Sequence, residues 1–204
     1  VEGALRSVGQ TLANMGAPDP RLTPSGKHDF RLYRQFRSYA KQDDPPSRVK
    51  PVPIQVIHHA TQLAVQHNTA QSLAVIQMLT IAFFFLMRPG EHTAPTGENA
   101  LFRLCDIQLH VGQLRYTGDT IPLHLLPAAS FVTYTFTTQK NSVRGEVIGL
   151  GRSGHTHCCP VEATSQRVLH LRLHDAPADT PLCTYFYQNG SHFVTSADIT
   201  TTLC

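Results

Sequence analysis

The chain has 204 residues, of which 41% are hydrophobic and 15% are charged, and its formal net charge is +3. This composition excludes an intrinsically disordered chain, because disorder accompanies low hydrophobicity and a high net charge. The length is sufficient for one large domain or two small ones.

Two helices are expected in the first forty residues. Apolar residues recur at helical spacing over residues 1–15, and Gly16 ends that pattern. A second helix is expected over residues 27–41, with its apolar side chains facing inward: Phe30, Leu32, Tyr33 and Phe36.

Positive charge is concentrated in residues 21–50, which hold eight basic and three acidic residues. Arg31, Arg34 and Arg37 recur every third residue and share one side of the expected helix. A basic face with interleaved aromatic residues suits contacts to a nucleic-acid backbone. The charge pattern alone leaves a solvated helix face as the alternative.

Four prolines between residues 45 and 53 exclude a helix and favour an extended linker, which carries Arg48 and Lys50. The first fifty residues are too few to form a stable hydrophobic core by themselves. We therefore expect residues 1–44 to be the C-terminal part of a helical domain. Residues 54–204 are expected to form a second domain.

The second domain is expected to begin with helices, continue as a small antiparallel sheet and end with helices. Its apolar run, residues 74–87, is shorter than a membrane span, which needs about 20 residues. Ser196 is the expected N-cap of the last helix. The expected helices are 54–68, 70–87, 160–174 and one from 196 to 203, and the expected extended segments are 101–109, 113–117, 131–138, 147–150 and 181–186.

The pentad Met87-Arg88-Pro89-Gly90-Glu91 ends the apolar run. If the apolar run is a buried helix, Arg88 at its end carries a positive charge with little access to solvent. Such a charge is unfavourable unless an anion meets it. The anion could be a structural carboxylate or a substrate phosphate.

Several of these features together resemble the tyrosine recombinase (phage-integrase-like) superfamily, with a closer likeness to recombinases of eukaryotic mobile elements such as the Crypton type. Leu86–Thr93 is similar to the first catalytic box, and Thr137–Asn141 is similar to the lysine turn. Cys159–Ala163 and then Pro181-Leu182 are similar to the stretch before the second box. The resemblance implies an α+β, mainly helical catalytic domain with a small antiparallel sheet, preceded by the end of a helical core-binding domain.

The resemblance also implies roles for individual residues. Arg88 would bind the scissile phosphate with Glu91 in support, and Lys140 would be the general acid. The implied DNA contacts are Arg31, Arg34, Arg37, Arg48, Lys50 and Arg144. The expected partner is double-stranded DNA, with self-association on it. We expect no metal, no cofactor and no membrane, and an intracellular location that is nuclear if the host is eukaryotic.

The family places a His/Lys-x-x-Arg box and a nucleophilic tyrosine after the helix that begins near Ser196, and neither occurs before Cys204. Tyr185 and Tyr187 precede that position. We therefore expect the sequence as given not to cleave DNA, and a longer reading frame to supply both elements. The alternative is a non-catalytic, domesticated or decayed DNA-binding remnant of a mobile element.

Residues 155–159 hold four potential zinc ligands, which are too close in sequence for all four to reach one ion, so a loop that enters the expected helix 160–174 is favoured. A zinc module that uses His155, Cys158 and Cys159 remains a third hypothesis. Five cysteines without regular spacing do not suggest a disulfide framework.

Overall fold

The computed structural model describes residues 2–42, 52–94, 101–136, 145–155, 157–188 and 190–203. The chain divides into two compact units, Val1–Pro51 and Val52–Cys204, each with its own internal contacts. No helix within the described ranges combines the length and the apolarity needed to cross a membrane.

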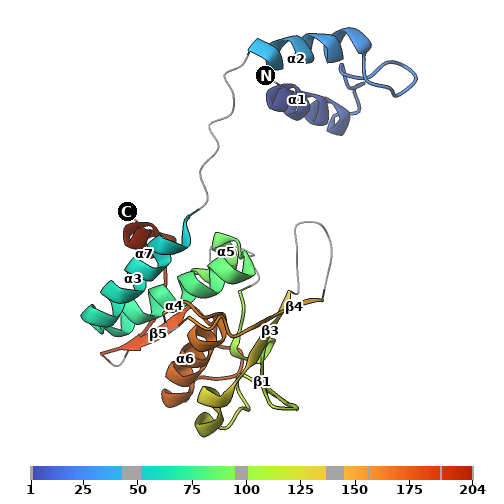
Figure 1. Ribbon diagram of the computed structural model, residues 1–204. Helices are drawn as coiled ribbons and strands as arrows, with labels where there is room; N and C mark the ends of the chain where they lie inside the picture. Colours follow the sequence, from blue (N-terminus) through green and yellow to red (C-terminus); the bar gives the residue numbers. More distant parts are fainter. Residues whose placement is uncertain are drawn as a thin grey trace. The chain divides into compact units, whose positions relative to one another are not determined.

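The first unit contains helix α1 (Glu2–Asn14) and helix α2 (Phe30–Gln42) (Figure 1). α2 begins three residues later than the sequence pattern indicated, because Asp29 caps it: Asp29 Oδ1 accepts hydrogen bonds from the backbone N–H groups of Arg31 and Leu32. The expected inward orientation of two aromatic residues is wrong. Phe30 and Tyr33 are exposed, at 68% and 52%.

The second unit is α+β and combines four longer helices with a small antiparallel sheet. The helices are α3 (Ile54–His67), α4 (Ala70–Phe85), α6 (Pro160–Leu173) and α7 (Ser196–Leu203). α4 is buried along most of its length and packs against both α3 and α6. A helix that is apolar on all sides is a core element, as the sequence pattern predicted for this run.

The main sheet is antiparallel, with strand order β2-β1-β3-β4. It consists of β1 (Ile107–Val111), β2 (Leu114–Thr117), β3 (Phe131–Phe136) and β4 (Glu146–Gly151), and α6 packs against β3 and β4. The first expected strand starts later than predicted, since residues Leu104–Asp106 form a 3-10 turn held by a hydrogen bond from Arg103 N to Asp106. A second 3-10 segment, Leu123–Ala128, was not expected from the sequence.

A separate hairpin pairs β5 (Thr184–Tyr187) with β6 (Gly190–Phe193), and α7 follows it. The expected N-cap of α7, Ser196, is wrong. Thr195 is the capping residue, because its Oγ1 accepts from Asp198 N at 3.1 Å while Asp198 Oδ2 accepts from Thr195 N at 2.7 Å. Reciprocal bonds of this kind satisfy two amides at the helix start.

An aromatic cluster lies where α4 meets the sheet. Tyr134 contacts Phe85 with ring centroids 4.5 Å apart and Phe102 at 5.2 Å, and Phe102 contacts Phe136 at 4.8 Å. All four rings are buried. The cluster therefore connects the last residue of α4 with the last residue of β3.

Candidate nucleic-acid interface

Arg88 lies in a turn between α4 and the short helix α5 (Pro89–His92). α4 ends at Phe85 and not at Met87, because Leu86 adopts a left-handed conformation with φ 52°. The N–H groups of Leu86 and Met87 both donate to Ala82 O, and Met87 is buried beneath the turn. These contacts satisfy one carbonyl group at the helix end and fix the path of the chain into Arg88.

The Arg88 side chain is 51% exposed, so the expectation of a charge held away from water is wrong. The break at Leu86 turns the chain before Arg88 and directs its side chain outward. Within the described part of the chain, the ion pair that Arg88 makes is a loose one, 3.8 Å from Nη1 to Glu91 Oε1. An ion pair this exposed contributes little to stability and leaves the guanidinium open to another anion.

Three groups hold the backbone of Arg88 in place. Glu91 Oε2 accepts from Arg88 N at 2.8 Å. His92 Nδ1 lies 2.8 Å from the carbonyl oxygen of Arg88, which assigns the ring proton to Nδ1. Burial lowers the pKa of His92 and favours its neutral form. Pro89 at the first helical position adds a fixed φ to this rigid frame.

The turn is also attached to α7 and to the residue that follows β6. Thr93 Oγ1 lies 3.2 Å from Ser196 Oγ, and Ala94 N donates to Val194 O at 2.7 Å. The roles of His92 and Thr93 were not expected from the sequence. Both residues follow Arg88 closely in sequence. The sequence does not show that the His92 ring bonds to the carbonyl of Arg88, nor that Thr93 contacts Ser196, which is 103 residues away.

The β3–β4 hairpin is the predicted location of the second catalytic residue. β3 ends at Phe136, and Gly145 N donates to Phe136 O at 2.9 Å at the base of the hairpin. Lys140 and Arg144 lie outside the described residues. Phe136 belongs to the aromatic cluster that also contains Phe85, so the segments that lead to Arg88 and to Lys140 both depart from that cluster.

The arginines of α2 are all exposed, as a contact surface requires. Arg34 lies over the ring of Phe30, with 5.9 Å from its guanidinium carbon to the ring centroid, and Arg37 lies over Tyr33 at 5.8 Å. Each pair combines a cation with an exposed aromatic face. Arg48 and Lys50 of the linker lie outside the described residues.

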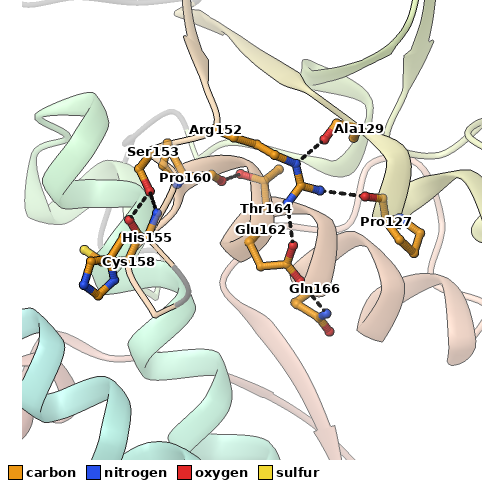
Figure 2. A network of polar contacts seen from close by, with 10 residues as sticks. All are labelled: Pro127, Ala129, Arg152, Ser153, His155, Cys158, Pro160, Glu162, Thr164 and Gln166. Atoms are coloured by element: carbon orange, nitrogen blue, oxygen red, sulfur yellow. Dashed lines mark hydrogen bonds and ion pairs between the residues drawn. The ribbon is translucent and has the colours of Figure 1, made fainter.

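Two other arginines of the second unit are engaged in structural contacts that the sequence does not reveal. Figure 2 shows Arg152 between the carbonyl groups of Ala129 and Pro127, each at 2.7 Å, with Glu162 at 3.1 Å. Arg167 is 1% exposed and donates to the carbonyl groups of Leu182 and Thr184. Burial lowers the pKa of Arg167 to about 10.

The loop that suggested zinc is organised by hydrogen bonds. Ser153 Oγ donates to Cys158 O at 2.6 Å and accepts from His155 N at 3.1 Å (Figure 2). Cys158 is buried, and the His155 ring stacks on His58 of α3 at 4.1 Å. Over the ranges that the structure describes, no three His, Cys, Asp or Glu side chains are grouped so as to hold a metal ion.

The tyrosines of the second hairpin differ in environment: Tyr185 is buried and Tyr187 is half exposed. Burial raises the pKa of Tyr185, which opposes formation of a phenolate.

Comparison of the chain with models of known families, with curated proteins and with solved structures found no match. What the site can do is therefore inferred from its residues and their geometry.

Proposed function

We propose that this chain binds double-stranded DNA in the manner of the tyrosine recombinases, with Arg88 as the residue that binds the scissile phosphate. The observation that carries the proposal is the state of Arg88: a half-exposed guanidinium on a rigid turn, whose ion pair with Glu91 is loose. Arg152 and Arg167, by contrast, donate to backbone carbonyl groups of the chain.

Arginine suits this role because its planar guanidinium binds two phosphate oxygens at once and stays protonated. The rigid turn supplies a fixed direction, so little ordering of the backbone is required when an anion arrives. Glu91 is a partner for Arg88 while no DNA is bound, and its contact of 3.8 Å is weak enough to be replaced by a phosphate.

The second unit has the α+β composition that the recombinase resemblance implies, with its small antiparallel sheet. Proton transfer to a leaving 5′-oxygen, the role that the resemblance implies for Lys140, accompanies attack of the family's tyrosine on the phosphate. In the DNA binding proposed here, Lys140 on the β3–β4 connection contacts the scissile phosphate and Arg144 contacts a neighbouring phosphate. The aromatic cluster supports this role, because it joins the end of α4 to the end of β3 and so links the two catalytic segments mechanically.

The first unit supplies a separate set of phosphate contacts in this proposal. Arg31, Arg34 and Arg37 are exposed on a helix whose sequence contains no acidic residue. Arg48 and Lys50 on the linker extend the positive charge in sequence. Two weak DNA-binding units on one chain bind more tightly together than either does alone, because the second contact is intramolecular.

A salt titration of DNA binding tests the proposal. The full chain would be titrated against a fluorescently labelled duplex by anisotropy at several salt concentrations. Each phosphate contact contributes roughly 0.9 to the slope of log affinity against log salt, so several arginine contacts predict a steep fall. A flat response, or no binding at low salt, would overturn the proposal.

A further inference from the structure

The first unit contains a hollow of about 470 Å³ between α1 and α2. Pockets for small organic groups have volumes of about 300–1,000 Å³, so the size suits a planar ring system. Arg6 and Gln10 of α1, which are one helical turn apart, lie on one side of the hollow. Leu32, Tyr33 and Phe36 of α2 supply an apolar and aromatic wall.

The acidic groups near the hollow are already occupied. Asp19 Oδ2 lies 2.6 Å from Arg21 Nη2, and Arg21 holds the pKa of Asp19 down to about 2. Asp29 caps α2 through two backbone amides. The hollow is therefore lined by two cations, Arg6 and Arg21, and by one carboxylate, Asp29. The ring of His28, a neutral amide and two aromatic side chains complete its polar and aromatic lining. This lining favours a flat aromatic group that is attached to an anion.

Tyr33 connects the hollow with the basic surface of α2. Its side chain is 52% exposed and lines the hollow, and the guanidinium of Arg37 lies 5.8 Å from its ring centroid. A base stacked on Tyr33 would thus have a phosphate-binding cation beside it. Base stacking on aromatic side chains is tolerant of sequence, because every base has a π-face.

We propose that the hollow between α1 and α2 receives a single unstacked base of DNA, with Tyr33 as the stacking platform, Gln10 at the base edge and Arg6 and Arg37 on the flanking phosphates. This inference rests on the proposed DNA binding and adds the form of DNA that the first unit recognises. A fully paired duplex keeps its bases in the stack and would use only the arginines, whereas an unpaired base can enter a pocket.

Three labelled duplexes of the same sequence test the inference with the full chain: one fully paired, one with a single bulged adenine, and one with an abasic residue in the bulge. The adenine bulge should bind about tenfold more tightly than the other two, given roughly 1–3 kcal/mol for each stacked base. A 2-aminopurine in the bulge should lose fluorescence when the chain binds, as the base stacks.

Tyr33→Ala should remove this preference, and Tyr33→Phe should keep it. Tyr39→Ala is the matched control, since Tyr39 is exposed on the same helix but does not line the hollow. The inference would be overturned by equal affinity for the adenine and abasic bulges, or by equal losses of affinity in the Tyr33→Ala and Tyr39→Ala variants. If the chain still bound the paired duplex in a salt-dependent manner, the proposed function would stand. A chain that binds none of the three duplexes would overturn both.

Discussion

Phe85 and Tyr134 pack with their ring centroids 4.5 Å apart, at an interplanar angle of 56°. Phe85 is the last residue of α4 and precedes Arg88 by three residues, while Tyr134 lies on the strand that leads into the hairpin. Both rings are buried. Their contact ties the turn that presents Arg88 to the strand that precedes Lys140, so the two proposed catalytic segments share one packed support.

Tyr134→Phe should lower the free energy of unfolding by about 1 kcal/mol, the usual contribution of one hydrogen bond. The Tyr134 hydroxyl lies 2.9 Å from Thr164 Oγ1, which itself donates to Pro160 O, and the ring contacts would remain. Denaturant unfolding would measure the change. Tyr116→Phe is the control on β2, where the side chain is half exposed, and equal stabilities of the two variants would contradict the role of this bond.

Leu86→Gly should raise the free energy of unfolding by about 0.5–1 kcal/mol. A left-handed conformation is unfavourable by about 1–2 kcal/mol for a residue with a Cβ, and the greater freedom of glycine in the unfolded chain offsets part of the gain. Leu86 is 87% exposed, so little packing is lost. Thermal unfolding would show a higher Tm, whereas Leu114→Gly on the exposed strand β2 should lower it. A lower Tm for Leu86→Gly would count against strain at this turn.

Glu91→Ala and Glu91→Gln should have different effects. Alanine removes the acceptor for Arg88 N and should lower stability by about 1 kcal/mol, as loss of a helix cap does. It should also weaken DNA binding, because the Arg88 turn loses its frame. Glutamine keeps an acceptor for Arg88 N and removes the negative charge near the phosphate. The Glu91→Gln variant should therefore bind DNA at least as tightly as the original chain. Anisotropy titrations would distinguish the two, and a glutamine variant weaker than the alanine variant would exclude a positioning role.

Acid should destabilise the second unit through His170. Burial, with smaller contributions from Arg167 and His174, lowers the pKa of His170 to about 4. Its Nε2 accepts a hydrogen bond from Phe186 N at 3.0 Å, which requires the neutral ring. The unfolded chain binds a proton near pH 6.5 and the folded chain does not, so stability falls as the pH drops from about 6.5 to 4.

His170→Gln keeps an acceptor but does not titrate, so its stability should depend less on pH over this window. Denaturant midpoints at pH 7, 5.5 and 4.5 would show the difference. Identical pH profiles for the variant and the original chain would mean that other groups cause the acid sensitivity.

Much of the second unit follows from local sequence patterns. The helices 54–67, 70–85 and 160–173 and the strands β2, β3 and β4 occur close to their expected positions, whereas β1 begins later than expected. Apolar runs and the residues that bound them mark these elements locally in the sequence. The β6 strand and α5 were not predicted, since each has only four residues, which is too short for a clear pattern of apolar residues. The exposure of Arg88 was also missed, because it follows from a left-handed leucine where no glycine marks the turn.

The site could be predicted only in part. The pentad around Arg88 was recognisable, and the roles of Arg152 and Arg167 were not, because their acceptors are carbonyl groups with no sequence signature. The exposed aromatic residues of α2 were expected to be buried, since periodicity shows which residues share a face and not what covers that face.

The most direct test of the central proposal compares Arg88→Ala with Arg115→Ala in duplex binding across a salt series. Each substitution removes one exposed arginine from the second unit. Arg115 lies on β2, outside the turn that contains Arg88. Arg88→Ala should weaken binding about tenfold or more and reduce the salt slope by about 1, because a charged hydrogen-bonded contact contributes about 1.5–3 kcal/mol. Arg115→Ala should bind like the original chain. Equal affinities and equal slopes for the two variants would contradict the assignment of Arg88 as a phosphate-binding residue.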